Sequence, residues 1–484
     1  MASKTGITLL GLGPGDPSLL TREAWEVLTQ APEVFLRTRQ HPTVAGFPPE
    51  LRLHSFDRLY QDGESFEAVY TEIVEQVLEL GQRPQGVVYA VPGHPYVGEA
   101  TSPEIARRAR ERGIPVRLVE GLSFLEVLFS ALEIDPLPHT TLVDALELAA
   151  LHHPPFPPSA PAVIAQIHSP AIASEVKITL MAQYPDEHPV QLVHNAGSPG
   201  VKVEHLKLFE IDRTRDIGLL TALYLPPLGG NTSLEAFQEI VAHLRAPDGC
   251  PWDREQTHQS LRPHLLEEAF EVLTALDADD PLAMREEFGD LLLQIVLHAQ
   301  IAAEYGEFTL AEVISGIHDK IVQRHPHVFG ELKLGDTAAV LQNWERMKAA
   351  EREAKGEQPT GLLDGVALAL PALAQAEAYQ KRAGRVGFDW PNLQGVMDKI
   401  EEELEEVRQA VSGEARAAEI GDLLFAVVNL ARWYEVDAES ALRETNQRFR
   451  RRFAFIEAAA AARERKLEDL TLDELNELWD ESKL

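Results

Sequence analysis

The second half of the sequence contains one pattern twice, and this repetition limits the folds open to the chain. "LLEEAFEV" is answered by "IEEELEEV", with Glu268 matching Glu403 at an offset of 403 − 268 = 135. "EFGDLLLQIV" is answered by "EIGDLLFAVV", with Asp290 matching Asp422 at 422 − 290 = 132. Two further pairs, "DKIVQR" with "QRFRRR" and "NWERMK" with "LWDESK", keep nearly the same spacing. The near-constant offset predicts two tandem copies of one helical unit.

Strand-like runs are confined to the first half. Up to about residue 225, short β-rich runs alternate with helical stretches, which is typical of an α/β domain. Six runs are predicted as strands: "GITLLGLG", "GVVYAVPG", "PVRLVEG", "PAVIAQI", "PVQLVHNAG" and "IGLLTALYLP". The proline-rich segment at residues 152–161 is predicted to connect two lobes of this domain.

The pattern changes at residues 226–233, where Pro, Gly and Asn indicate a linker. Thr232 or Ser233 is predicted to cap a helix that begins at Leu234. Beyond that point the apolar residues recur with the helical period, and only helices are predicted. The predicted domains are an α/β domain at 1–225, a linker at 226–233, and helical units at 234–356 and 357–484.

The helix predicted at residues 285–300 carries acids among apolar residues. Glu287 and Asp290 share a narrow stripe flanked by leucine, and the rest of the circumference is almost wholly apolar. The pattern predicts a deeply packed helix that takes its two acids inside. Glu419 and Asp422 repeat the arrangement in the second copy.

The preceding helix of each copy adds further acids within about one turn. These are Glu268 and Glu271 in the first copy, and Glu403 and Glu406 in the second. Two like charges 4 Å apart repel by about 4 kcal/mol at an effective dielectric of 20, so such a cluster needs a cation. Oxygen ligands favour Mg²⁺, with Mn²⁺ as a substitute. Because Mg²⁺ commonly binds substrate phosphates as well, the cluster indicates a phosphate-transfer or hydrolysis site.

Two basic pairs agree with this interpretation. Lys320 with Arg324, and Arg448 with Arg452, stand four residues apart, so each pair shares a helix face from which it could hold phosphate oxygens. Each pair taken alone fits a solvated surface equally well. The duplication of the whole set favours a site.

The acidic pattern EExxE followed by ExxD, together with "CPWD" at residues 250–253 and "RHPHVFGE" at 324–331, resembles the MazG family of nucleoside triphosphate pyrophosphohydrolases. "QKRAGRVGFDW" at 380–390 opens the second unit as in tandem members of that family. The resemblance covers about residues 234–484. It implies an all-α fold, bound Mg²⁺, and hydrolysis of a nucleoside triphosphate to the monophosphate and pyrophosphate.

The resemblance also implies roles for individual residues. The implied metal ligands are Glu268, Glu271, Glu287 and Asp290 in the first unit and Glu403, Glu406, Glu419 and Asp422 in the second. The implied catalytic carboxylates, one of which serves as base, are Glu268, Glu271, Glu403 and Glu406. The implied phosphate-binding residues are Lys320, Arg324, Lys348, Lys381, Arg448 and Arg452. Both units keep their acids, so the sequence leaves open whether one or both are active.

The first half resembles the tetrapyrrole methylases that use S-adenosylmethionine. The resemblance rests on the glycine-rich turn in "LLGLGPGDPSLLTREAWEVLTQA", on residues 89–124, and on "PVQLVHNAGSP", and it covers about residues 5–225. The Gly-Asp-Pro triplet usual in that family is replaced here by Gly93, His94 and Pro95. The replacement of the aspartate bears on methyl transfer more than on the fold. The implied cofactor-binding residues are Gly11, Gly13, Gly15, Asp16, Pro92, Gly93, His94 and Ser123.

Charge and composition restrict the partners. The 44 basic and 77 acidic residues give a net charge of −33, which repels nucleic acid. No apolar run approaches the roughly 20 residues of a membrane-spanning helix, so no membrane partner is expected. The single cysteine, Cys250, and the lack of a signal segment predict a cytoplasmic protein. The expected partners are nucleoside triphosphates, S-adenosylmethionine, an unknown methyl acceptor and, since such helical units commonly pair, a second copy in a homodimer.

The sequence therefore predicts a two-lobed α/β tetrapyrrole methylase-like domain followed by an all-α MazG-type domain of two tandem units. The favoured function is Mg²⁺-dependent nucleoside triphosphate pyrophosphohydrolysis, fused to a domain that binds S-adenosylmethionine. In one alternative the methylase-like half is the active enzyme and the helical half regulates or assembles it. In a third reading the chain is purely an interaction protein, which would give the acids no purpose.

Overall fold

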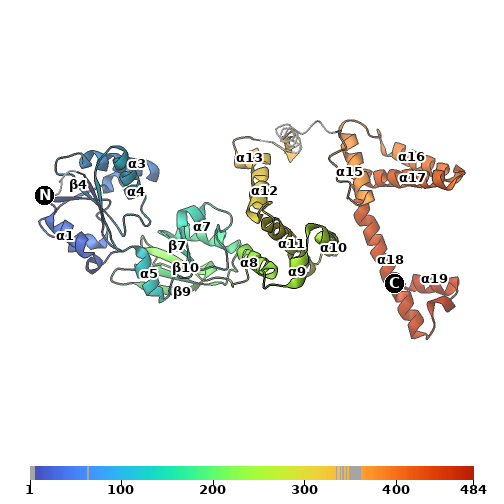
Figure 1. Ribbon diagram of the computed structural model, residues 1–484, viewed down its shortest axis with the longest axis horizontal. Helices are drawn as coiled ribbons and strands as arrows, with labels where there is room; N and C mark the ends of the chain where they lie inside the picture. Colours follow the sequence, from blue (N-terminus) through green and yellow to red (C-terminus); the bar gives the residue numbers. More distant parts are fainter. Residues whose placement is uncertain are drawn as a thin grey trace. The chain divides into compact units, whose positions relative to one another are not determined.

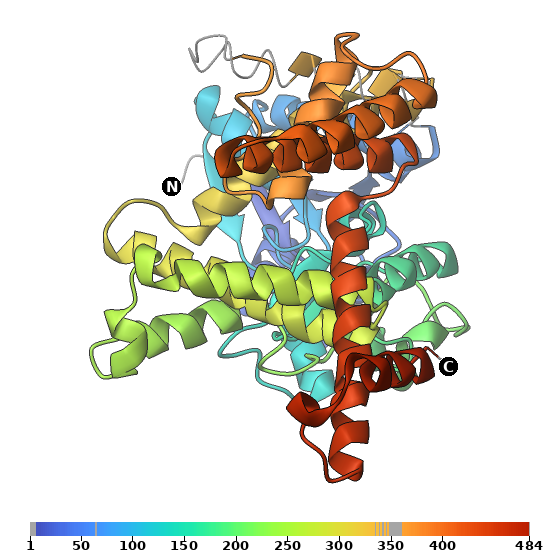
Figure 2. The ribbon, with the colours of Figure 1, turned by 90° about the vertical axis from the view of Figure 1, so that its right-hand side faces the viewer.

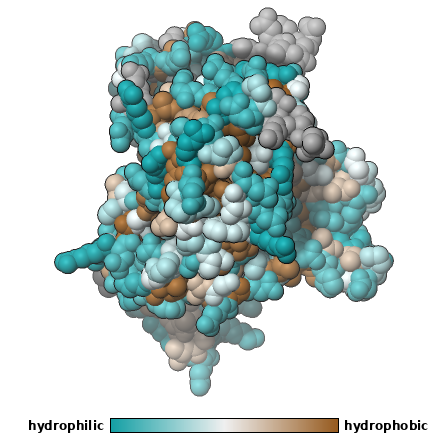
Figure 3. Space-filling view, turned by 90° about the vertical axis from the view of Figure 1, so that its left-hand side faces the viewer, coloured by the Kyte–Doolittle hydropathy of each residue, from teal (hydrophilic) through white to brown (hydrophobic). Residues whose placement is uncertain are grey.

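The computed structural model divides the chain into two compact units, Met1–Leu244 and Arg245–Leu484 (Figure 1). The described residues are 6–62, 65–333, 335–337, 339–340, 343–344, 346–347 and 361–483. Lys348 and the predicted boundary between the two helical copies, at residues 356 and 357, lie outside them. Hydrophilic residues cover most of the face seen in Figure 3.

The first lobe of the first unit is a parallel sheet with the strand order β3-β2-β4-β1-β5. Its strands are β1 (Ile7–Gly11), β2 (Glu33–Leu36), β3 (Arg52–Ser55), β4 (Val87–Val91) and β5 (Val116–Val119). Figure 1 shows helices on both sides of this sheet. They include α1 (Arg22–Gln30) on one face and α3 (Phe66–Gly81) and α4 (Thr101–Glu111) on the other.

Alternation along β1 explains this two-faced packing. Ile7 and Leu9 pack into the core beneath α3 and α4, whereas Leu10 packs into the core beneath α1. Since successive side chains of a strand point to opposite faces, a strand covered on both faces must be apolar throughout. This requirement made β1 and β4 readable from the sequence. The edge strand β5, which carries the exposed Arg117, was predicted as well, and all three are confirmed.

The second lobe is a mixed sheet with the order β6-β7-β10-β8-β9, in which only β6 and β7 run parallel. Its core lies between the sheet and α7 (Pro170–Met181), and α5 (Phe124–Leu132) packs on the opposite face. The strands are β6 (Thr141–Asp144), β7 (Ala162–Ala165), β8 (Pro189–His194), β9 (Lys202–Lys207) and β10 (Thr221–Leu225). The predicted strands β7, β8 and β10 are thereby confirmed.

The proline-rich segment at 152–161 does not separate the lobes, and that prediction is wrong. β6 precedes the segment and pairs with β7, which follows it, so both ends of the segment belong to the second sheet. Phe156 is buried in the core of this lobe. The chain passes from one lobe to the other between β5 and β6 instead, because α5 already packs on the second sheet.

No helix or strand occupies residues 226–233, as predicted, and Ser233 caps α8 (Leu234–Arg245) by accepting a hydrogen bond from the Ala236 amide (3.2 Å). Ser159 Oγ donates to Ser233 Oγ (2.7 Å), which ties this segment to the second lobe. Most of α8 therefore belongs to the first compact unit. The boundary between the units falls after the predicted linker, at Leu244.

The second unit is helical, as predicted, and each copy of the repeated pattern forms a helical hairpin (Figures 1 and 2). The first hairpin pairs α10 (His258–Asp277) with α11 (Pro281–Glu304), and α12 (Leu310–Arg324) follows it. The second pairs α16 (Leu393–Gln409) with α17 (Gly413–Trp433), and α18 (Ala438–Ala462) follows it. The remaining helices of this unit are α9 (Pro251–Glu255), α13 (Pro326–Phe329), α15 (Ala372–Arg385) and α19 (Leu472–Glu481).

The prediction that α11 is packed deeply on all sides is wrong for the single chain. Phe288 remains 49% exposed and Leu292 41% exposed, and on α17 Leu424 remains 52% exposed. Of the two acids on α11 that were predicted to lie inside, Glu287 is half-buried and Asp290 is exposed. Helical periodicity identifies an apolar face but not the chain that covers it, and the homodimer stays a prediction.

Within the described part of the chain, no helix combines the length and apolarity needed to cross a bilayer.

Candidate functional site

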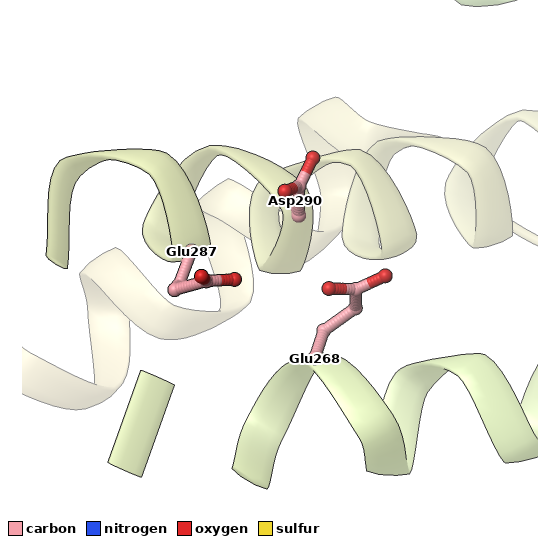
Figure 4. Close-up of side chains that lie close together, drawn as sticks. All are labelled: Glu268, Glu287 and Asp290. Atoms are coloured by element: carbon pink, nitrogen blue, oxygen red, sulfur yellow. The ribbon is translucent and has the colours of Figure 1, made fainter. Parts of the chain in front are cut away.

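The first copy gathers three carboxylates between its paired helices. Glu268 projects from α10 toward Glu287 and Asp290 on α11 (Figure 4), and the three offer oxygen atoms within 4.8 Å of one another. Burial, followed by the negative charge of Asp290, raises the pKa of Glu268. Burial also raises the pKa of Glu287, followed by the charge of Glu271. Glu271 thus lies near the group without being one of the three.

The second copy gathers a related set. Glu403 and Glu406 on α16 and Glu419 on α17 offer oxygen atoms within 4.8 Å of one another. Glu403 is buried, Glu419 is half-buried and Glu406 is exposed. Burial and then the charges of Glu403 and Glu419 raise the pKa of Glu406. The predicted fourth member, Asp422, lies outside this group but lines an adjacent cavity.

Glu403 shows that the second cluster fits a cation. Its side chain is only 6% exposed, and Lys399 Nζ lies 2.7 Å from its Oε1. Its Oε2 is buried and has no hydrogen-bond partner among the described residues. A buried acceptor without a partner costs about 1–3 kcal/mol, which a bound cation would remove. An oxygen-only donor set at this spacing suits Mg²⁺.

A cavity of about 550 Å³ adjoins Glu403 in the second copy, a size typical of small-molecule sites. Its lining combines aromatic rings with charged side chains. The aromatic and cationic residues that line it are Tyr379, Phe388, Trp390, Phe425, Lys399 and Arg432. Such a lining suits a ligand that has a planar ring and an anionic group.

Local structure fixes the loop that carries Trp390. Asn392 caps α16 by accepting a hydrogen bond from the Gly395 amide (3.2 Å). A Cβ at Gly395 would lie 2.8 Å from the indole ring, so glycine lets Trp390 pack against the first turn of the helix. Arg432 Nη2 on α17 donates to Asp389 Oδ1 (2.6 Å) and holds the other side of the loop.

The five predicted phosphate-binding residues that the structure describes lie elsewhere in the single chain. Lys381 pairs with Glu377, Arg452 lies 5.5 Å from the ring centroid of Trp479, and Arg448 donates to Thr445 Oγ1 (2.8 Å). Lys320 and Arg324 are on α12, and none of these five lines the cavity. Their role stays a prediction.

Sequence reasoning missed the two cations that do line the cavity, Lys399 and Arg432. A lysine four residues before a glutamate normally indicates a solvated surface pair. The available signal was the position of Lys399 one turn before Glu403, in the segment "MDKIEEELEEV".

In the first unit, three glycines meet at the carboxyl ends of β1, β4 and β5. A Cβ at Gly11 would lie 2.5 Å from the Gly121 nitrogen and 2.8 Å from the Gly93 oxygen. The Gly93 amide donates to the Gly13 carbonyl (2.8 Å), and the Gly13 amide donates back to Gly93 (3.2 Å). The predicted residues Gly11, Gly13 and Gly93 are therefore brought together at the edge where parallel α/β sheets bind ligands.

Gly15 and Asp16 face the second lobe instead. A Cβ at Gly15 would collide with Ser198 Oγ, and the Asp16 amide donates to the Gly197 carbonyl (2.7 Å). The Asp16 side chain accepts a hydrogen bond from the Ser18 amide (2.8 Å). These two residues thus join the lobes, and this use does not require a cofactor.

The other predicted cofactor residues are close in sequence to Gly93 and Gly121. Pro92 and His94 lie on either side of Gly93, and His94 Nδ1 accepts a hydrogen bond from the Tyr96 amide (3.0 Å). Ser123 is buried and caps α5 by accepting a hydrogen bond from the Leu125 amide (3.0 Å). All three belong to loops at the same edge of the first sheet.

The chain belongs to the family of fusions between a tetrapyrrole methylase-like domain and a MazG region. The model of the tetrapyrrole (corrin/porphyrin) methylases matches residues 6–212, and that of the MazG nucleotide pyrophosphohydrolase domain matches 256–329 and 392–454. YabN of Bacillus subtilis, an uncharacterized protein, is 42% identical over all of this chain and 99% of its own. The two separate MazG matches confirm the predicted tandem copies.

Two further comparisons concern the separate halves. The nucleoside triphosphate pyrophosphohydrolase/pyrophosphatase MazG of Thermotoga maritima is 43% identical over 51% of this chain and 95% of its own. The crystal structure of uroporphyrin-III-C-methyltransferase from Thermus thermophilus covers 47% of this chain and 95% of its own, with 22% identity and a TM-score of 0.37.

Proposed function

We propose that the chain is a Mg²⁺-dependent nucleoside triphosphate pyrophosphohydrolase that forms the monophosphate and pyrophosphate. One observation carries the proposal: the buried Glu403, with an unpartnered oxygen, belongs to a group of three carboxylates beside an aromatic cavity. The names of the MazG relatives, which share 43–44% identity with the second half of the chain, support the same reaction.

The residues of the second copy divide the work. Glu403, Glu406 and Glu419 would hold Mg²⁺, which supplies charge neutralisation and lowers the pKa of an attacking water. Lys399 neutralises the phosphates, and the aromatic rings stack on the base. Asp422 lines the cavity outside the group of three, so its carboxylate can accept the proton of the water that attacks the α-phosphorus.

We infer that the second copy is the working site. At the offset of 135, the position of Lys399 is taken in the first copy by His264 (399 − 135 = 264). The His264 ring lies 3.7 Å from Glu267 and edge-on to Trp252. Glu268 has no lysine or arginine partner among the described residues, and it is more exposed than Glu403. The first copy therefore lacks the paired, buried carboxylate.

Product analysis tests the proposal. Incubation of the full chain with canonical and modified nucleoside triphosphates and Mg²⁺ is expected to give equal amounts of monophosphate and pyrophosphate. A chelator should stop the reaction, and Mg²⁺ or Mn²⁺ should restore it. Release of orthophosphate alone, or turnover in the presence of the chelator, would contradict the proposal.

A second activity concerns the first unit, where we propose that S-adenosylmethionine binds against Gly11, Gly13 and Gly93. The close approach of these backbones leaves glycine as the only residue that fits at Gly11, whereas a Cβ built at Gly93 meets no atom of the described residues within 4 Å. Titration calorimetry on the full chain is expected to show saturable binding of one S-adenosylmethionine per chain. Absence of measurable heat of binding at millimolar S-adenosylmethionine would contradict the proposal.

A further inference from the structure

The cavity of the second copy contains a side-chain amide whose orientation is fixed. Gln380 on α15 lines the cavity and is 7% exposed, and its Nε2 donates to the carbonyl oxygen of Phe425 (2.8 Å). Since a carbonyl oxygen can only accept, the amide nitrogen must face Phe425. Oε1 is then turned the other way. It is buried and has no partner among the described residues.

A second amide is fixed in the opposite sense. Asn429 lines the same cavity, and its Oδ1 accepts from both Nε (3.0 Å) and Nη2 (2.7 Å) of Arg432. A guanidinium group only donates, so Asn429 must direct its oxygen toward Arg432 and its NH₂ group away. Asp389 in turn holds Arg432 (2.6 Å). Within the part of the chain that the structure describes, the Asn429 NH₂ group has no hydrogen-bond acceptor.

The two amides belong to one surface. Phe425, which anchors Gln380, and Asn429 stand four residues apart on α17 and so share a helix face. The cavity therefore presents a fixed acceptor and a fixed donor among aromatic rings. In the first copy, the offset of 132 places Leu297, a buried apolar residue, at the position of Asn429 (429 − 132 = 297). The amide donor of Asn429 is therefore present in the second copy and has no counterpart at the matching position of the first.

We propose that Gln380 and Asn429 read the hydrogen-bonding edge of the nucleobase. This inference rests on the proposed function and names the part of the substrate that the cavity recognises. The edge of each common base carries a donor beside an acceptor, as in the amino group and N1 of adenine. Gln380 Oε1 accepts from the base donor, and Asn429 Nδ2 donates to the base acceptor, while the rings stack on its faces.

The proposal predicts selection against a base that lacks the donor. Purine riboside triphosphate differs from ATP only in the missing amino group, so it would leave Gln380 Oε1 buried without a partner. A site built around such a hydrogen bond rejects the deficient analogue strongly. The kcat/KM for pyrophosphate release from ATP should exceed that for purine riboside triphosphate by at least about tenfold.

Two variants separate the roles of the amides. Gln380→Met removes the acceptor and should bring the ratio of the two kcat/KM values close to one. The Phe425 carbonyl keeps its helical hydrogen bond in this variant. Asn429→Asp keeps an acceptor for Arg432 but loses the donor, so kcat/KM should fall about tenfold for both substrates while their ratio is retained. The exposed Gln394 provides the matched control, and Gln394→Met should change neither value.

The outcomes distinguish this inference from the proposed function. Equal kcat/KM values for ATP and purine riboside triphosphate in the unmodified chain would overturn the inference and leave pyrophosphate release intact. A wild-type ratio in a folded Gln380→Met variant would do the same. If Gln380→Met fails to fold, the comparison of the two substrates on the unmodified chain still decides. No pyrophosphate from any nucleoside triphosphate would overturn the proposed function itself.

Discussion

Glu403→Gln is expected to lower kcat for pyrophosphate release by about 10²- to 10³-fold. Glutamine keeps the size of the side chain and an acceptor for Lys399, but it removes the negative charge from the buried member of the metal-binding group. Loss of one preorganised electrostatic group typically has an effect of this size. Steady-state kinetics with saturating Mg²⁺ measures it, and calorimetry should show weaker Mg²⁺ binding.

The first copy supplies the matched comparison. Glu268→Gln is expected to change kcat less than about threefold, because the first copy lacks the paired, buried carboxylate. Glu405→Gln serves as a control on the same helix, since Glu405 is exposed and pairs with Arg408 (3.2 Å). A double variant of Glu268 and Glu403 that keeps full activity would remove the assignment of both clusters. A larger loss from Glu268→Gln than from Glu403→Gln would move the working site to the first copy.

Gly11→Ala is expected to destabilise the first unit by more than about 3 kcal/mol. The new Cβ would meet the Gly121 nitrogen and the Gly93 oxygen, both backbone atoms that cannot move aside as a side chain would. Gly93→Ala is the control, because no atom of the described residues lies within 4 Å of its built Cβ, so that the cost is the positive φ of 68°, about 1–2 kcal/mol. Hydrogen exchange of the β1 and β4 amides in the full chain measures both effects. Equal protection in the two variants would show that the three backbones are not in close contact.

Five of the six predicted strands lie in the interior of their sheets, and the missed strands explain the limit of the method. β3 and β9 are edge strands, and the four exposed or half-exposed positions of β3 carry Arg, Leu, His and Ser. An edge strand with alternating polar residues has no apolar run to identify it. The sheet order and the true lobe boundary depend on pairings that no local pattern contains.

The candidate site was predictable where it is repeated and local. Glu403 and Glu419 stood out because the first copy repeats their spacing, and the structure brings them together. Lys399 and Arg432 were missed because their neighbours along the helix made them ordinary surface residues. Gly15 was predicted to contact a cofactor, but its neighbour is Ser198, which lies far away in the sequence. Contacts of this range follow from the fold and not from a motif.

The link between the glycine-rich turn and the second lobe has a mechanical consequence. The Asp16 amide donates to the Gly197 carbonyl, and Gly15 lies directly against Ser198. The glycine-rich turn of the first lobe is therefore in direct contact with the loop that follows β8 in the second lobe. A molecule that pushes the turn aside must also displace the segment that follows β8. The parallel sheet and the mixed sheet would therefore respond together to an occupant at this turn.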